Sequence, residues 1–386
     1  MSDNDTNNHI INVVDDFDYS TQNSAYNEQF RKWRKNSDNP YAFGYEDNKL
    51  ESVYVTGRGF VENSVLDEEK KVLTRIFNII GIAALMWLVV DNTVPEFFAF
   101  LMNRFGFNIN NNFFSSSIYG GKKEILIVLM LCGLLRVLLP TLYLHFKLKL
   151  PRKVEVMKRL NSPRALLGAI SATLILCSAV SIPVAYSGNS KEIYEYFARI
   201  NADIYVWDQK ELIIYIFFDV IVASVLSELL FRGGMFAVLR QFGDPFAIIV
   251  SAITSALLTQ DFIQMPAVFL ISLAAGYGLI TSGTIFTAAV VHMIYKMYTL
   301  TLTIIELDTS DKMPLVRNLF MIAALISGAI GLALCCIPLL KKKKKNIALY
   351  NSELDFGKRL VHSVKVFPYS VVALICIVCA VVKAVQ

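Results

Sequence analysis

Long apolar blocks recur along this chain between short polar or charged segments, and they constrain its fold more than any other feature of the sequence. They lie at about residues 74–91, 124–146, 165–187, 210–232, 246–260, 264–280, 284–306, 316–340 and 366–384. A stretch of roughly 20 apolar residues is what an α-helix needs to cross the hydrocarbon core of a bilayer. Hydrophobic residues make up 55% of the chain and charged residues only 18%, whereas soluble proteins average about 45–50% and about 25%. The sequence therefore predicts an all-α polytopic membrane protein with eight to nine transmembrane helices, of which the fifth and sixth are short.

A polar region, residues 1–71, precedes the predicted membrane domain at residues 72–386. It carries fourteen acidic and eight basic residues, a net charge of −6, and it is rich in aromatic residues. They include Tyr19, Tyr26, Phe30, Trp33, Tyr41, Phe43, Tyr45 and Tyr54. They follow no clear period, so the region fits either short interaction segments with a small ordered subdomain or a disordered cytoplasmic tail. No short apolar run opens the chain, which predicts that the first block is a retained span and not a cleaved signal.

The charges of the connecting segments predict the orientation. Seven Lys and Arg residues lie between Lys147 and Arg164, and five consecutive lysines run from Lys341 to Lys345. The connection at 188–209 has more acidic than basic residues. Because short cytoplasmic loops are enriched in Lys and Arg, both basic connections and the N-terminus are predicted to lie in the cytoplasm. A lysine run beside a membrane can also bind anionic lipid, although its commoner role is to set topology.

Several ionisable side chains interrupt the apolar blocks, where they are costly and tend to mark function or a structural partner. They are Arg136 in the second block, Asp219, Glu228 and Arg232 in the fourth, and His292 and Lys296 in the seventh, with Gln260 and Asp261 at the end of the fifth. Glu228 and Arg232 are four residues apart, in the order that favours an ion pair on one helix face. Gly233 and Gly234 follow them, which predicts that the helix loosens or ends there, at its cytoplasmic end, and that Glu228 lies about one turn inside the membrane.

Asp219 and Lys296 are predicted to pair. Lys296 lies about 18 Å along the seventh span from its cytoplasmic end at Thr284, and Asp219 lies about 13 Å further from the cytoplasm than Glu228, at about 1.5 Å per residue. The two side chains should therefore reach a similar depth, and each needs a partner there.

The stretch SELLFRG at Ser227–Gly233 resembles the first motif of the CAAX protease and bacteriocin-processing family, also called type II CAAX-like or Abi proteins. The family pattern is Glu-Glu-x-x-x-Arg near the end of one helix, then Phe-x-x-x-His in the next helix and His-x-x-x-Asn/Asp in a later one. SAITSALLTQ occupies the second place here and VHMIYKM the third. The resemblance covers about residues 165–300, the predicted protease-like core. It implies an intramembrane endopeptidase fold in a bacterial plasma membrane.

The match is incomplete at the positions that carry the family's chemistry. Ser227 stands in place of the first glutamate, Ser255 and Thr259 replace the phenylalanine and histidine, and Lys296 replaces the Asn/Asp, while Glu228, Arg232 and His292 match. The resemblance implies that the first glutamate and the second-motif histidine activate water. Neither Ser227 nor Thr259 can accept a proton near neutral pH, and losing a general base commonly costs about 10²–10⁴ in rate. The matching Glu228–Arg232 pair belongs to the bracing part of the motif.

Three functions remain open from the sequence. The first is a catalytically impaired family member that binds a hydrophobic or lipidated peptide or acts in regulation, with membrane lipids around it and a cytoplasmic partner at the N-terminal region. The second is an active endopeptidase with a rearranged site at Glu228 and His292. The third, less favoured, is a transporter with a polar path along the ionisable side chains.

No cofactor is expected. Catalytic zinc takes about three protein ligands, and one histidine with one salt-bridged carboxylate falls short of that number. Cysteines inside apolar segments behave as small hydrophobes, and all six lie there: Cys132, Cys177, Cys335, Cys336, Cys376 and Cys379. Nothing in the sequence suggests a nucleic-acid partner.

Overall fold

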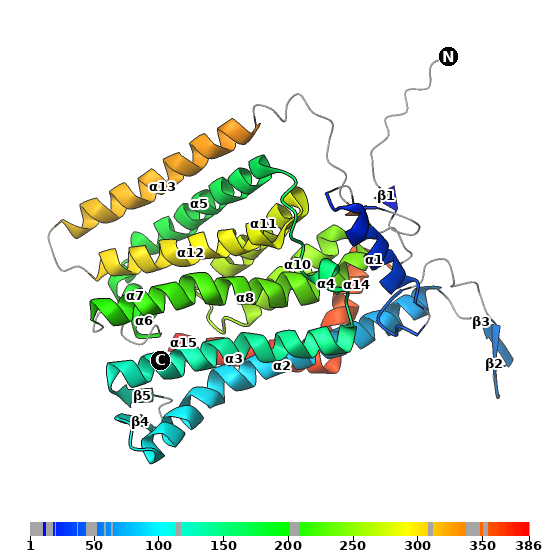
Figure 1. The fold of residues 1–386 in the computed structure, drawn as a ribbon, viewed down its shortest axis with the longest axis horizontal. Coiled ribbons are helices and arrows are strands. Elements are labelled where there is room, and N and C mark those ends of the chain that lie inside the picture. Colours follow the sequence, from blue (N-terminus) through cyan, green and yellow to red (C-terminus); the bar gives the residue numbers. More distant parts are fainter. Residues whose placement is uncertain are drawn as a thin grey trace.

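The computed structural model describes residues 11–12, 18–19, 21–36, 38–43, 52–57, 59–62, 65–112, 117–200, 208–307, 312–336, 348–349 and 354–385. It is a bundle of helices that run along one common direction (Figure 1). Eight of the described helices are long and apolar enough to cross a membrane, and a ninth apolar helix is shorter. The predicted all-α polytopic membrane fold is therefore confirmed.

The long helices follow one another up and down the bundle. They are α2 (Val65–Arg104), α3 (Lys122–Leu148), α5 (Pro163–Ala185), the composite helix from α7 (Gln209–Ile216) to η4 (Arg240–Phe242), α11 (Met265–Ser282), α12 (Ile285–Glu306), α13 (Met313–Cys336) and α15 (Phe367–Val385). The short apolar helix is α10 (Asp244–Leu257). The first span is far longer than the predicted 74–91, because α2 runs for 40 residues.

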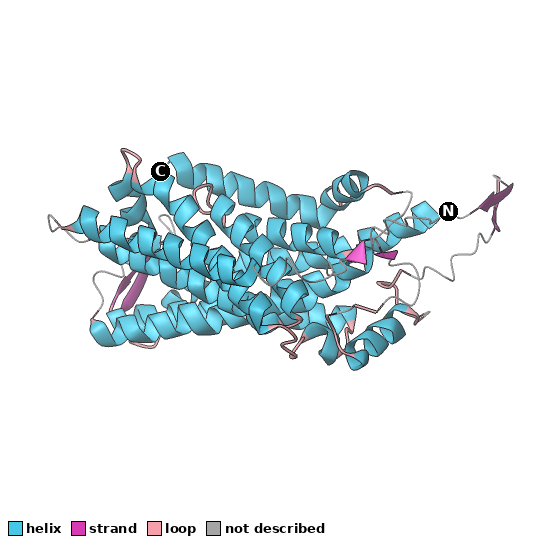
Figure 2. Cartoon of the chain, turned by 90° about the horizontal axis from the view of Figure 1, so that it is seen from above, coloured by secondary structure: helices cyan, strands magenta, loops and turns pink. Residues whose placement is uncertain are grey.

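The remaining described elements lie at the two ends of the bundle (Figures 1 and 2). They are α1 (Ser24–Arg34), α4 (Arg152–Glu155), α6 (Ser190–Ile200), α14 (Phe356–Val364), the antiparallel hairpins β2–β3 (Ser52–Val55, Gly59–Glu62) and β4–β5 (Ile109–Asn112, Ser117–Gly120), and the parallel pair β1–β6 (Ile11–Asn12, Ala348–Leu349). We call the end that carries α1, α4 and α14 the amino-terminal side. The end that carries α6 and β4–β5 is the distal side.

The fourth span does not end at Gly233 and Gly234, as the sequence predicted. The helix continues through π-helical turns at η2 (Phe217–Ala223) and η3 (Leu229–Phe236), then through α9 (Ala237–Leu239), to Phe242. The glycines serve packing, because a Cβ on Gly234 would stand 2.7 Å from the Leu144 side chain of α3. Glu228 therefore lies fourteen residues before the helix end, about 21 Å from it at 1.5 Å per residue, and not one turn inside the surface.

The amino-terminal segment, which we define as the described residues from 18 to 43, packs onto the amino-terminal side of the bundle. Its side chains Tyr19, Tyr26, Phe30, Trp33 and Phe43 are all buried in the main hydrophobic core. Their burial within the same chain gives these aromatics a packing role. The burial of two further aromatics is not described. Tyr45 lies outside the described residues, and only the backbone of Tyr54 is described.

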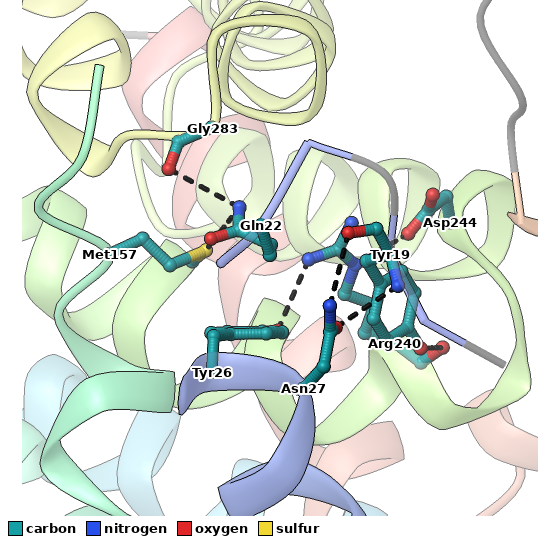
Figure 3. A network of polar contacts seen from close by, with 8 residues as sticks. All are labelled: Tyr19, Gln22, Tyr26, Asn27, Met157, Arg240, Asp244 and Gly283. Carbon is teal, nitrogen blue, oxygen red and sulfur yellow. Dashed lines mark hydrogen bonds and ion pairs between the residues drawn. The ribbon is translucent and has the colours of Figure 1, made fainter. Parts of the chain in front are cut away.

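Arg240, near the end of the composite helix, joins the amino-terminal segment to the bundle (Figure 3). Its guanidinium lies 3.7 Å from the centre of the Tyr19 ring, donates to the Tyr26 hydroxyl at 3.1 Å and pairs with Asp244 at 2.7 Å. Burial raises the pKa of the Tyr19 and Tyr26 phenols, so both stay neutral near physiological pH. Gln22 reaches the Gly283 carbonyl at 3.2 Å in the same figure.

Candidate functional site

One cavity in the middle of the bundle brings together the family-motif positions. It is lined by Asp219, Ser227, Ser255, Thr259, His292 and Lys296, along with side chains of α2, α3, α11 and α15. Its volume of about 420 Å³ falls in the range of small-ligand sites, roughly 300–1,000 Å³. We call it the core cavity. Residues from separate helices thus converge on one space, as the motif spacing requires.

The hydroxyls at the two base positions are turned to their own helices. Ser227 Oγ donates to the Ser224 carbonyl at 3.0 Å, and Thr259 Oγ1 donates to the Ala256 carbonyl at 2.7 Å. Such bonds to a carbonyl three residues earlier are the usual way for Ser and Thr to satisfy a hydroxyl within a helix. Neither hydroxyl is bonded to an imidazole or a carboxylate that could take its proton. The two positions therefore lack the arrangement that activates a nucleophile.

Glu228 lies behind the cavity wall and does not line it. Its side chain is fully buried, with one oxygen 3.3 Å from Arg232 Nε and the other in contact with His292 Nδ1. The imidazole therefore lies between the buried carboxylate and the cavity. His292 is the side chain through which the buried carboxylate reaches the cavity.

Arg232 extends the buried polar network to α11 and to Ser255 of α10 in the cavity wall. Its Nη2 donates to the Ser272 carbonyl at 2.6 Å, and the Ser272 hydroxyl donates to Ser255 Oγ at 3.1 Å. The composite helix, α11 and α10 are thereby joined through buried groups. This geometry suits the bracing role that the resemblance implies for Glu228 and Arg232, because removing either charge would leave the other uncompensated.

Lys296 and Asp219 form the predicted pair. Lys296 Nζ lies 2.7 Å from Asp219 Oδ1 and 3.0 Å from the Asp219 carbonyl. Both side chains are partly exposed, at 28% and 29%, because they face the cavity. Lys296, which stands in place of the family's Asn/Asp, is thus neutralised by the carboxylate of Asp219.

A second polar cluster in the wall contains a residue that the sequence argument missed. Arg136 Nη1 lies 2.7 Å from Asp91 Oδ1, and its guanidinium stacks 4.9 Å from the Trp87 ring centre. Gln260 donates to Asp91 Oδ2 at 3.2 Å and accepts from Asn92 at the same distance. Asp91 is the last residue of the predicted first block. The sequence signal for it was Arg136 in the second block, a charge inside a span for which no partner had been predicted.

The connection between α10 and α11 lies at membrane depth. α10 has 14 residues, which span about 21 Å, less than the hydrocarbon thickness of about 30 Å. Non-helical backbone is tolerated at such depth where protein buries it or where it lines a water-filled cavity. Protein buries the backbone here, because Gln260 is 1% exposed, and Asp261 lines the core cavity. Gln260 also has a φ of +53°, which its bonds to Asp91 and Asn92 hold in place.

The core cavity reaches toward the distal side of the bundle. His292 lies seven residues past the start of α12, about 10 Å from it, and the lining continues to Thr303, three residues before the helix ends. Lys383, near the end of α15, also lines it. On the amino-terminal side, every residue from Leu230 to Phe242 is buried.

The described residues offer no evident metal centre. Within the described ranges, no three His, Cys, Asp or Glu side chains come together as candidate ligands. The side chains of five cysteines are described there, and none of the five is in a disulfide. Cys132, Cys177, Cys335 and Cys376 are buried, and Cys379 is partly buried. Two carboxylates that line the cavity, Asp91 and Asp219, are instead paired with Arg136 and Lys296 of neighbouring helices.

Comparison with known proteins yields one match. Residues 209–298 match the family model of Type II CAAX prenyl endopeptidase Rce1-like proteins. The matched stretch runs from the start of α7 to Tyr298 in α12, and it contains every motif position that lines the cavity. No curated protein and no solved structure matches the chain.

Proposed function

We propose that this chain, which belongs over residues 209–298 to the Rce1-like family of type II CAAX prenyl endopeptidases, binds a peptide segment in the core cavity without cleaving it. The observation that supports this is the state of the two base positions. Ser227 and Thr259 donate their hydroxyls to backbone carbonyls of their own helices. A site in this condition keeps a place for a substrate and lacks the general base that would act on it.

The lining of the cavity also favours binding. Two ion pairs, Asp219–Lys296 and Asp91–Arg136, share the wall with the apolar side chains of Trp87 and Phe231. Polar groups that converge on one cavity beside apolar and aromatic side chains are typical of ligand sites. Peptide is the ligand class that the family match suggests.

Binding and cleavage can be measured together in lipid nanodiscs. A fluorescent peptide with a farnesylated C-terminal Cys and its unlipidated twin are mixed with the protein, anisotropy reports binding, and mass spectrometry reports cleavage. We expect saturable binding of at least one peptide and its recovery intact. Ser227→Trp, which fills the cavity, should abolish binding, whereas Asn189→Trp at an exposed distal site should not. Peptide fragments in the wild-type reaction, or no binding at all, would contradict the proposal.

A rearranged active site is the second candidate, because Glu228 contacts His292 Nδ1 and His292 lines the cavity. A carboxylate that orients an imidazole in this way is the arrangement of a general base in hydrolases. Glu228→Gln separates the two functions. If Glu228 acts as part of a general base, the wild type should cleave peptide and the variant should turn over about 10²–10⁴ more slowly. If Glu228 only braces the helices, the variant should lose thermal stability and no cleavage should be seen in either protein.

A transporter would expose its site to each side of the membrane in turn. In this structure the amino-terminal side is closed by the buried stretch from Leu230 to Phe242 and by the segment packed on it. The cavity thus reaches toward one side only, which is sufficient for a binding site, whereas transport would also require this closed side to open.

A further inference from the structure

The core cavity is placed asymmetrically in the bundle. It begins at the depth of His292 and widens toward groups of the distal side, among them Asp261 in the α10–α11 connection and Lys383 of α15. Asp261 is 5% exposed, and its Oδ2 is buried with no hydrogen-bond partner among the described residues. A buried carboxylate oxygen without a partner is costly unless water reaches it. The cavity is the space from which water can do so.

The amino-terminal side is closed by two layers. The inner layer is the stretch from Leu230 to Phe242, buried throughout. The outer layer is the amino-terminal segment, which is fixed by Tyr26 to Arg240 at 3.1 Å and by the Phe43 backbone amide to Gln241 Oε1 at 2.8 Å. The Trp33 indole donates to the Leu148 carbonyl at 2.9 Å. A ligand approaching from this side would have to displace both layers.

Charge identifies which side of the membrane each end faces. The connection between α3 and α5 lies on the amino-terminal side and belongs to the stretch Lys147–Arg164 with its seven Lys and Arg residues. The connection at 188–209, on the distal side, has more acidic than basic residues. Basic loops remain in the cytoplasm. The closed amino-terminal side is therefore cytoplasmic, and the distal side is not.

We propose that the core cavity is filled from the non-cytoplasmic face of the membrane, by a polypeptide segment presented there and not by a cytoplasmic chain end. The nature of the ligand rests on the proposed function; the side of access rests on the geometry and the loop charges alone. The segment would pass the α10–α11 connection and reach the Asp219–Lys296 pair before the level of His292. Its approach requires no movement of the amino-terminal segment.

Cysteine accessibility tests the side of access. In a background with the six native cysteines replaced by alanine, Thr259→Cys is compared with Thr254→Cys, five residues earlier on α10, which is 1% exposed and bonded to Tyr369. Lys158→Cys marks the amino-terminal side and Asn189→Cys the distal side, both at exposed positions. A membrane-impermeant thiol reagent is applied to intact cells and, in parallel, to permeabilised cells.

We expect T259C and N189C to be modified in intact cells, K158C only after permeabilisation, and T254C in neither case. Modification of T259C only after permeabilisation, with N189C modified in intact cells, would overturn the proposed side. So would an inverted pattern for K158C and N189C, or a T259C that stays unmodified in both preparations. The reagent needs no ligand, so a wrong side leaves peptide binding in nanodiscs untouched, and a failure of peptide binding leaves this pattern unchanged.

Discussion

At the scale of single residues, the family positions fall into two groups with different surroundings. Glu228 and Arg232 are fully buried and joined to each other and to the Ser272 carbonyl. Ser227 and Thr259 are partly exposed to the cavity and bonded only to their own helices. Loss of a buried charge pair costs stability, whereas a cavity hydroxyl can change with little structural effect. The retained residues are thus the ones that the fold needs.

Restoring the family residues at the base positions should restore chemistry. We expect the double variant Ser227→Glu, Thr259→His to hydrolyse peptide at a rate about 10²–10⁴ above the wild type, the usual contribution of a positioned base. Ser227→Glu alone supplies the carboxylate without its imidazole and is the matched control. Hydrolysis is followed by mass spectrometry of the products. A double variant as inactive as the single one, at equal folded yield, would argue against protease ancestry for this cavity.

How far the site could be predicted also depends on single residues. The Asp219–Lys296 pair follows from matched depths on two helices, since a charge within a span requires a partner. The contact between Glu228 and His292 did not follow, because the azimuth of each helix is set by packing against its neighbours and not by spacing. Asp91 was missed for a related reason. It closes the first predicted block, and only the real length of α2 places it inside the bundle.

Elements show the same balance between what sequence encodes and what packing decides. The apolar blocks predicted each long helix, because an apolar segment that crosses the membrane must be about as long as the hydrocarbon core is thick. The two glycines after Arg232 predicted a helix end that is absent, because Gly234 lies where α3 approaches the composite helix and Gly233 lies where α4 does. A glycine pair signals either a terminus or a close approach. Sequence alone does not distinguish the two.

The Asp219–Lys296 pair connects η2 to α12 and can be tested as a unit. Asp219→Lys and Lys296→Asp should each lower the folded yield in detergent, because each places two like charges together at membrane depth. The double swap should restore the yield by rebuilding the pair in reverse. Size-exclusion profiles and thermal melts measure this. An unrescued double variant would show that the contact is incidental.

Gly81 marks the closest approach of α2 to α15. A Cβ at this position would lie 2.6 Å from the Tyr369 backbone nitrogen, and backbone cannot give way as a side chain tip does. We expect Gly81→Ala to destabilise the protein by about 1–3 kcal/mol, the usual cost of overpacking. Gly188→Ala, where nothing lies within 4 Å, is the control and should be close to neutral. Thermal unfolding in detergent compares the two, and equal melting temperatures would contradict this packing.

At the scale of the whole molecule, the amino-terminal segment and the membrane domain share one hydrophobic core. The aromatic residues of the amino-terminal segment belong to the same hydrophobic core as the helix ends that they cover. The sequence indicated an ordered segment or a tail without deciding between them, since the aromatics follow no period. Tertiary burial decided it for the described residues. A cytoplasmic partner stays a prediction, and such a partner would bind a surface other than these buried rings.

Trp33 tests this unity. It is 6% exposed, stacks on Phe30 and donates to Leu148. Trp33→Ala should cost about 3–5 kcal/mol, as for other buried aromatics, and should increase proteolysis of the amino-terminal segment. Lys32→Ala, with a side chain 74% exposed, should leave both unchanged. If Trp33→Ala frees the segment to proteases without lowering the melting temperature, the segment is attached to the bundle but does not stabilise it.

The contacts of Tyr26 also impose a delay during synthesis. Its hydroxyl meets Arg240 at a separation of 214 residues. At roughly 5–20 residues per second, a ribosome needs on the order of 10–40 seconds to make that intervening chain. Throughout that interval the aromatic side chains near the start of the chain have no finished surface to cover. We expect them to be bound by chaperones or by the membrane surface until the fourth span is in place, which makes this short segment the part of the nascent protein most exposed to misfolding.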